Sequence, residues 1–504
     1  MNQIDDFFRS RLDQMIDLRK PLAVLATHIP WQELEAAVAH RFARQVRTGR
    51  KVEDSDLFGP TVAVVGTGHS NAGRPRLPMR LMISLLYLKH TFNESDEGVC
   101  ERWSDAPTWQ YFSGQEYFEN RLPCDPSAIS RFRGLLGEEG VEELLVQTLV
   151  VAIKLGLIER TAMQSVIVDS TVQAKAVAHP TDSRLLEVAR QKIACAAKAH
   201  GIALKQSYAK EGRELARKAG RYAHAKQYRR MHKTIKRQRT ILGRLARDIG
   251  RNKTVLAQSI QDALDPLLAR AHKIAAQSRR GAKVKGKDKV YSWHADEVEC
   301  ISKGKARTPY EFGVKVGIVT TLKGNLIVGA RSFPGNPYDG HTLAEQLEQS
   351  RILMEAVDVA PQTVYTDLGY RGVDAEIPEY SLKHRGKFKR LTDQERRMLK
   401  RRQAVEPIIG HLKSDHGMNR CHLKGQTGDA IHAVLCAAGF NIKWLLRMIA
   451  RKGIGPLFLC RFIAWIGRQI QRLMPMMGSR GDWVDPVGCL PYRNPWPQIA
   501  GNPA

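Results

Sequence analysis

The sequence predicts a mixed α/β sheet that carries one large basic α-helical insertion after its first strand and follows an all-α N-terminal region. Two short β-branched runs, 165–168 and 362–367, each lead to an aspartate, and the composition of a β-hairpin lies between them at 310–333. Residues 175–305 place apolar side chains every three or four positions among basic ones, as helices do. Strands on both sides of a helical block predict a sheet with an insertion.

Length and these changes of character divide the chain into parts. At 504 residues it is too long for one ordinary core. We expect a helical N-terminal region, a sheet domain in two pieces, a basic helical insertion and a C-terminal tail, at 1–160, at 161–174 with 306–450, at 175–305 and at 451–504 respectively.

The charge indicates a polyanionic partner. The chain has 79 Lys and Arg against 51 Asp and Glu, a net charge of +28. Residues 191–290 contain 27 basic and 6 acidic residues, so 27 − 6 = +21 lies in this one stretch. A generally basic surface would spread the excess over the chain. We therefore expect nucleic acid to bind the insertion.

Nothing in the sequence predicts secretion, a membrane partner or a disulfide framework. The opening "MNQIDDFFRSRLDQMIDLRKP" is charged and lacks the apolar core of a signal peptide. The apolar runs "ELLVQTLVVAIKLGL" and "GPLFLCRFIAWIG" are too short for a bilayer or are broken by charge. Eight cysteines include no C-x-x-C pair, so we expect reduced, ordinary cysteines in a soluble, cytoplasmic protein.

A helix start in the N-terminal region is a candidate for contact with nucleic acid. Asp125 and Pro126 are typical of the first positions of a helix. Small polar residues and arginines follow them, a composition that suits phosphate and groove contact in a helix-turn-helix-like unit: Ser127, Ser130, Arg131 and Arg133. A solvated amphipathic helix is the alternative interpretation of the same pattern.

After the insertion the expected order is hairpin, helix, strand, short strand and helix. The corresponding residues are 310–321 and 325–333 for the hairpin, then 340–357, 362–368, 379–384 and 392–417.

The two strand-end aspartates, Asp169 and Asp367, are the candidate chemistry. In an open α/β sheet, side chains from neighbouring strands converge at strand ends. Two carboxylates brought together repel each other unless a cation lies between them. An arginine or a structural salt bridge could supply that cation. In a basic chain that faces a polyanion we favour Mg²⁺ or Mn²⁺, because these ions take oxygen ligands and a two-metal site promotes phosphodiester displacement.

A third acid is expected downstream, and Glu406 is the candidate. Arg402 precedes it by four residues and Lys413 follows it by seven, so in a regular helix all three lie on one face. An ordinary Arg–Glu pair one turn apart would explain Arg402 but not Lys413. Pro407 removes a backbone hydrogen bond and is expected to kink the helix, which weakens the placement of Lys413.

These blocks resemble bacterial insertion-sequence transposases of the DDE class, in the group with a Tyr-Arg-Glu-Lys signature. "IVDST" at Asp169, "YTDLGYRG" at Asp367 and R-x3-E-x6-K from Arg402 to Lys413 match the three blocks of the family in order. "NPYDGHTL" and "GRPRLPMRLMISLLYLKH" are also similar to this family, and the resemblance covers most of residues 70–450. One departure is visible, because the tyrosine of the signature falls on Leu399.

The resemblance implies an RNase H-like catalytic core that cuts and joins DNA at the ends of an element. It implies that Asp169, Asp367 and Glu406 are catalytic and hold two Mg²⁺ or Mn²⁺ ions, while Tyr370 and Arg371 face DNA together with Arg402 and Lys413. Its partners would be double-stranded DNA, as terminal inverted repeats and target, and a second copy in a homodimer at the bacterial nucleoid. A structure-specific nuclease of the same fold and a DNA-binding protein without chemistry are the alternatives.

Overall fold

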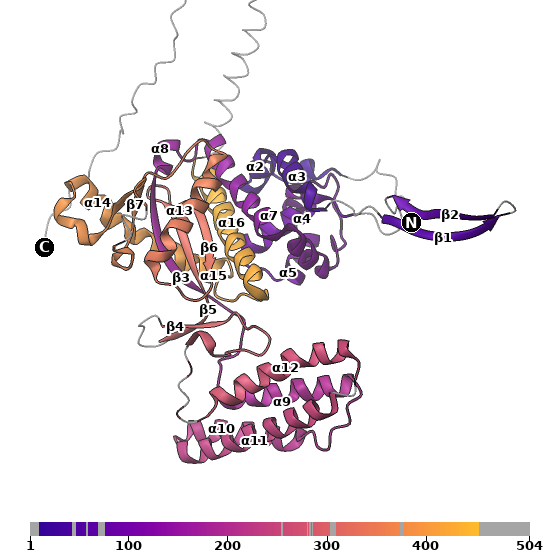
Figure 1. The fold of residues 1–504 in the computed structure, drawn as a ribbon. Coiled ribbons are helices and arrows are strands. Elements are labelled where there is room, and N and C mark those ends of the chain that lie inside the picture. Colours follow the sequence, from indigo (N-terminus) through magenta and orange to yellow (C-terminus); the bar gives the residue numbers. More distant parts are fainter. Residues whose placement is uncertain are drawn as a thin grey trace, which may run out of the picture. The chain divides into compact units, whose positions relative to one another are not determined.

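A six-stranded mixed sheet lies at the centre of the fold (Figure 1). The computed structural model describes residues 10–42, 47–56, 59–68, 76–253, 256–279, 281, 284, 286–302, 309–372 and 377–452. The strands of the sheet are β3 (Ser165–Ala174), β4 (Glu299–Ser302), β5 (Tyr310–Thr321), β6 (Ile327–Phe333), β7 (Thr363–Tyr365) and β8 (Ser381–Lys383). β5 pairs antiparallel with β3, β4 and β6, whereas β3, β7 and β8 run parallel.

β3 is longer than the sequence predicts, and Asp169 lies inside it instead of at its end. The β-branched run stops at Val168, but backbone pairing with β5 continues to Ala174. Pairing with β7 covers only Ser165 to Ile167. Asp169 therefore lies just beyond the part of β3 that pairs with β7. The end of β7, and not the sequence of β3, determines this position.

Helices and short 3₁₀ segments cover the sheet. They are α13 (Asp339–Glu355), η5 (Leu368–Tyr370), η6 (Arg385–Arg390), α14 (Asp393–Arg401), η7 (Arg402–Ala404), α15 (Val405–Asp415) and α16 (Gly425–Lys452). α14 begins at a capping box, in which the Thr392 hydroxyl accepts from the Glu395 amide and the Glu395 carboxylate accepts from the Thr392 amide. Val405 of α15 packs with Ile167 of β3 and Tyr365 of β7. The start of α15 thus lies over the strands that carry the predicted acids.

The N-terminal region is not all-α as predicted, because it contains a β-hairpin. Strands β1 (Arg47–Asp56) and β2 (Gly59–Gly68) pair antiparallel. The run Thr61–Val65 is rich in β-branched residues, which favour strands over helices. The helices of the region are α1 (Leu12–Met15), α2 (Pro21–His28), α3 (Trp31–Ala39), η2 (His40–Phe42), α4 (Met79–Phe92), α5 (Asp96–Asp105), α6 (Pro107–Phe112), α7 (Pro126–Lys154) and α8 (Arg160–Met163).

One hydrophobic core joins the N-terminal helices to the sheet. Side chains of α2 to α7, β3, β5, β6, α13 and α16 belong to a single buried cluster. Asn441 of α16 connects the two regions, because its amide nitrogen donates to Thr148 Oγ1 of α7 at 2.9 Å and to the Ile327 carbonyl of β6 at 2.8 Å. The change of composition near residue 160 therefore does not mark an independent core.

The basic stretch forms α9 (Asp182–Ala199), α10 (Ala209–His224), α11 (Tyr228–Asn252), α12 (Gln258–Gln277) and the short η4 (Gly286–Asp288), in the chain between β3 and β4. Helices α9, α11 and α12 share a separate hydrophobic cluster that includes Ile193, Ile249 and Leu268. β4 lies within the predicted range of the insertion, so the sheet resumes at Glu299 and not after residue 305. We call α9–α12 the helical bundle.

One helix in the described part of the chain, α16, is long and apolar enough to cross a membrane by length and composition. Of its most apolar window, 72% is buried inside the fold, as expected of a core helix. From residue 453 onward the predicted C-terminal tail lies outside the described residues.

Candidate active site

Asp169 and Asp367 occupy matching positions on neighbouring parallel strands. Ser165, Val166 and Ile167 of β3 pair with Thr363, Val364 and Tyr365 of β7, a constant offset of 198 residues. The same offset relates Asp169 to Asp367, since 169 + 198 = 367. Asp169 and Asp367 each lie two residues after the last paired residue of their chain segment. The register of β3 and β7 therefore brings both acids to the edge of the sheet where β7 ends.

A tight turn holds the Asp367 carboxylate. Its Oδ1 accepts from the Gly369 amide at 2.7 Å and caps η5. A Cβ added to Gly369 would lie 2.9 Å from Asp367 Oδ1 and 3.4 Å from Asp339 Oδ2. Those two oxygens are therefore no more than 2.9 + 3.4 = 6.3 Å apart, and any side chain at position 369 would crowd both of them.

Asp339 is a fourth acid of this group that the sequence interpretation did not identify. It is the first residue of α13, and its Oδ1 lies 3.0 Å from Lys315 Nζ of β5. The stretch "NPYDGHTL" had been noted for its family resemblance, but only the packing of α13 on β5 and β6 places its aspartate beside Asp367. The usable sequence signal was an acid at the first position of a helix, six residues after a strand.

Arg402 extends the group from the segment before α15, and the exposed Glu406 follows it in the chain. The Arg402 Nη1 donates to Asp169 Oδ2 at 3.2 Å. The backbone is right-handed helical at Arg402, Ala404 and Val405, so Glu406 follows one turn later. Pro407 lies in the first turn of α15, where its missing N–H costs no intrahelical bond. The predicted kink becomes a short 3₁₀ segment before Glu406.

Lys413 forms an ion pair away from the acids. Its Nζ lies 3.0 Å from Glu311 Oε2 of β5. The residue of β5 opposite Asp169 is Ile318, seven positions along the strand from Glu311, which is roughly 23 Å. Residues on one face of a helix are still separated along the helix axis by the rise per residue. Lys413 therefore lies farther along α15 than Glu406.

Tyr370, which was predicted to face DNA, has a buried side chain in this structure. The residue is 1% exposed and packs in the main core. Burial raises the pKa of its hydroxyl well above the usual value, and the nearby negative charges of Asp339, Asp169 and Asp367 raise it further. The ring thus lies beneath the acids as their support. Arg371, the next residue, is exposed.

At the start of α7, two of the four predicted DNA contacts are engaged inside the protein. Arg133 is 5% exposed and donates to both carboxylate oxygens of Asp96, and the Ser130 hydroxyl also donates to Asp96. Burial would raise the pKa of Asp96, but hydrogen bonds from Arg133 and the charge of Lys89 lower it to about 2. Ser127 and Arg131 remain exposed.

The acids together fit a hard divalent cation. Carboxylate oxygens are the ligands that Mg²⁺ and Mn²⁺ prefer. Arg402 meets Asp169 and Lys315 meets Asp339. Within the described residues, Asp367 and Glu406 form no ion pair, although the chain carries a net charge of +28. Acids left without a cationic partner in so basic a chain are the donor set expected of a metal site.

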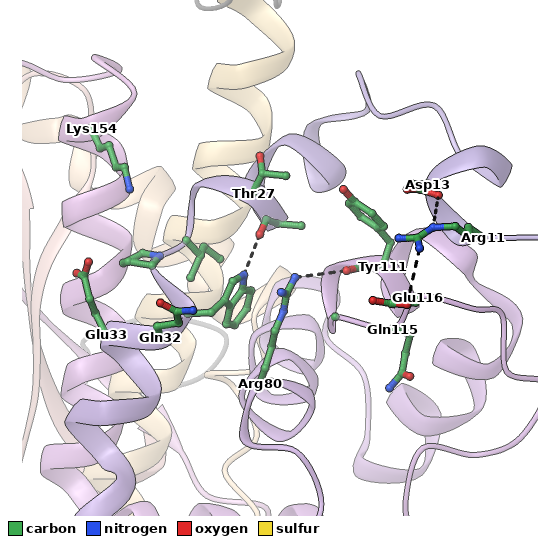
Figure 2. Close-up of a pocket in the computed structure, with 15 residues that line it drawn as sticks. Arg11, Asp13, Thr27, Gln32, Glu33, Arg80, Tyr111, Gln115, Glu116 and Lys154 are labelled. Atoms are coloured by element: carbon green, nitrogen blue, oxygen red, sulfur yellow. Dashed lines mark hydrogen bonds and ion pairs between the residues drawn. The ribbon is translucent and has the colours of Figure 1, made fainter. Parts of the chain in front are cut away.

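A large cavity elsewhere contains none of these acids. It measures about 610 Å³ and lies among α1, α2, α3, α4 and α6 (Figure 2). Two of its arginines have partners, since Arg11 meets Asp13 and Glu116, and Arg80 stacks over the Trp31 ring at 4.7 Å. Cavity size therefore does not mark the candidate active site in this protein.

Two transposase family models match the chain. The model described as "Transposase domain (DUF772)" matches residues 51–135, and the model described as "Transposase DDE domain" matches residues 372–446. The second match contains Arg402, Glu406 and Lys413, whereas Asp169 and Asp367 precede it.

The chain is also similar to a rhizobial protein. An "Uncharacterized protein ORF8 in nfe locus" of Rhizobium meliloti is 39% identical over 224 residues, which is 44% of this chain and 95% of that protein. No solved structure matches the chain.

Proposed function

Because this chain belongs to the DDE transposases of insertion sequences, we propose that it cuts DNA at the ends of its element and joins them to a target, with Asp169, Asp367 and Glu406 as the catalytic acids. The observation that carries this assignment is the matched register of Asp169 and Asp367 beside Arg402, which lies one turn from Glu406. We infer an RNase H-like core from the strand arrangement, in which an antiparallel trio β6–β5–β3 continues into the parallel strands β7 and β8.

Asp169, Asp367 and Glu406 would hold two Mg²⁺ or Mn²⁺ ions. Such ions activate the attacking oxygen and stabilise the leaving oxygen in phosphodiester displacement. The fold keeps the ligands in place before any ion binds, because strand pairing fixes Asp169 and the Gly369 amide fixes Asp367. Asp339 lies close enough to Asp367 to hold or orient a ligand at the same site.

Arg402 has a separate role in this proposal. Its guanidinium neutralises part of the charge on Asp169 and can turn toward a DNA phosphate when a cation replaces it there. The position of the signature tyrosine is Leu399, which is 6% exposed and packs with Val405 and Ile167. The assignment to the Tyr-Arg-Glu-Lys group thus rests on Arg402, Glu406 and Lys413. The residue at the tyrosine position is a leucine that packs in the core.

The helical bundle supplies nonspecific affinity for double-stranded DNA in this proposal, and the exposed Ser127 and Arg131 remain candidate contacts for the element ends. Exposed basic side chains on α11 recur on one side of the helix: Arg229, Lys233, Lys236, Arg244 and Arg247. Processing two ends requires two active sites, so we propose a homodimer that acts on the bacterial chromosome in the cytoplasm.

A strand-transfer assay tests the function. The purified chain is mixed with Mg²⁺, a labelled duplex that carries one element end, and a target plasmid. Cleavage at the end followed by joining to the plasmid supports a transposase. Hydrolysis at the end without any joined product would identify a nuclease, and end binding without cleavage would identify a DNA-binding protein without chemistry.

A further inference from the structure

Helices α4 and α16 cross at very short range, at a point far from the acids in the sequence. A Cβ added to Gly439 of α16 would lie only 2.5 Å from the carbonyl carbon of His90 in α4, so only glycine permits this approach. The crossing places His90 beside two residues one helical turn apart, His432 and Cys436. They are 4%, 8% and 0% exposed, respectively.

The three side chains are arranged as metal ligands. One ligand atom from each lies within 4.8 Å of the other two. Cys436 Sγ is 3.6 Å from His432 Nε2 and 3.8 Å from His90 Nδ1. Zinc binds sulfur at about 2.3 Å and imidazole nitrogen at about 2.0 Å, and tetrahedral angles then separate sulfur from nitrogen by about 3.5 Å. The observed spacings match that value within a few tenths of an ångström.

The polar atoms around the cluster are only partly used by the protein. His90 Nε2 is buried and, among the described residues, has no hydrogen-bond partner. His432 Nε2 lies 3.1 Å from the Gly417 carbonyl, and His416 Nδ1 lies 2.8 Å from the His90 carbonyl. Among the described residues the His90 ring therefore has one hydrogen-bond partner, the Cys436 sulfur, which leaves this imidazole available to a metal ion.

A cavity of about 590 Å³ reaches the cluster and offers space for a fourth ligand. His90 and His432 line it, together with the acidic side chains of Glu94, Asp96 and Glu97. Lys89, Arg133 and Arg420 also line it, so its charges are balanced. A water molecule in this cavity could complete a four-coordinate site. Three protein ligands with an open fourth position are a known zinc arrangement.

We propose that His90, His432 and Cys436 bind one Zn²⁺ ion, which ties α4 of the N-terminal region to α16. On binding, the Cys436 thiol loses its proton to solvent through the cavity, and His432 carries its single proton on Nδ1 so that Nε2 coordinates the ion. The Gly417 carbonyl then no longer accepts a hydrogen bond from His432 Nε2 and accepts one from water instead. The ion joins residues that are 346 positions apart, and it is separate from the carboxylate site, which offers only oxygen ligands.

The full-length protein tests this proposal by its metal content. We expect about one zinc per chain after dialysis against a weak chelator, measured by mass spectrometry of the metal. Cys436→Ala should reduce this to background. Cys421→Ser is the matched control and should keep its zinc, because Cys421 is as buried as Cys436 but its sulfur lies against the Leu423 carbonyl, at 3.8 Å, and the Asp429 side chain.

Cobalt substitution keeps the test independent of any variant that fails to fold. Co²⁺ added to metal-free wild-type protein should give a sulfur-to-cobalt charge-transfer band, which oxygen ligands alone do not produce. The Asp169→Asn, Asp367→Asn, Glu406→Gln triple variant should keep both this band and its zinc. Absence of the band in wild type, or zinc that follows the three acids and persists in Cys436→Ala, would overturn the site and leave the proposed catalysis untouched.

Discussion

The basic row of the helical bundle and the acids of the candidate active site are placed by the fold in different ways. On α11 the basic residues recur at helical spacing over about 27 Å, and no ion pair within the described residues engages any of Arg229, Lys233, Lys236, Arg244 or Arg247. In the sheet, the acids come from segments nearly 240 residues apart and meet only through strand register and helix packing. A row of charges tolerates imprecision, whereas a metal site does not.

This difference predicts that cleavage and duplex affinity can be lost separately. Substitution of the acids should have the largest effect, on cleavage. Asp169→Asn, Asp367→Asn and Glu406→Gln should each reduce cleavage by on the order of 10³-fold or more, because an amide keeps the size but not the charge that holds Mg²⁺. Duplex affinity should stay within about twofold. Cleavage of a labelled element end and a gel-shift titration measure the two quantities, and near wild-type cleavage by any one variant would remove that residue from the set of ligands.

Neutralising the basic row should give the opposite pattern. Glutamine at Arg229, Lys233, Lys236, Arg244 and Arg247 should flatten the slope of log affinity against log salt by about 0.9 for each lost phosphate contact. The preference for element ends over random duplex should survive. Five exposed basic residues outside the bundle, Lys20, Arg121, Lys154, Arg160 and Lys323, provide the control when changed to glutamine. An unchanged slope in the α11 variant would assign the affinity to another surface.

Arg402 and Lys413 provide a sharper comparison within α15 and its approach. Arg402→Gln should slow cleavage about 10- to 100-fold, because Arg402 contacts Asp169 directly. Lys413→Gln should leave the cleavage rate nearly unchanged, since its ammonium pairs with Glu311. Single-turnover cleavage measures both. Equal slowing in the two variants would mean that Lys413 leaves Glu311 when DNA binds.

Asp339 should show whether the acid group has a fourth member. Asp339→Asn should slow cleavage about tenfold and raise the Mg²⁺ concentration that gives half the maximal rate, because Asp339 lies beside Asp367. Asp393→Asn, an exposed acid in the first turn of α14, is the control. Rates measured across a Mg²⁺ titration test this, and unchanged metal dependence would make Asp339 only the partner of Lys315.

Asp96 should give the smallest effect, and on stability alone. Its folded pKa of about 2 lies below the usual 3.8, so its charge stabilises the fold above pH 4 and loses that contribution as the pH falls toward 2. Asp96→Asn should lower the free energy of unfolding by about 2 kcal/mol at neutral pH. The difference from wild type should shrink between pH 4 and pH 2 in denaturant titrations. A pH-independent difference would assign the loss to packing.

The sequence alone indicated much of the local structure. The hairpin of β5 and β6 and the helix α13 follow from β-branched runs and helical periodicity, which are local properties. The sequence interpretation did not predict the hairpin at 47–68, although its second strand also contains a run of β-branched residues. The acids Asp169 and Asp367 were chosen from the sequence because two strand-end carboxylates need a cation between them, and Glu406 because it is a downstream acid with basic residues on the same predicted helix face.

Only the tertiary structure decided which of those side chains meet. Strand register brings Asp367 level with Asp169, and the packing of α13 adds Asp339. Lys413, farther along α15, pairs with Glu311 instead of lying with the acids. Tyr370 and Arg133 are buried and have little contact with solvent. Sequence periodicity specifies the face on which a residue lies, but the distance along an element and the partner that covers that face depend on contacts between segments hundreds of residues apart.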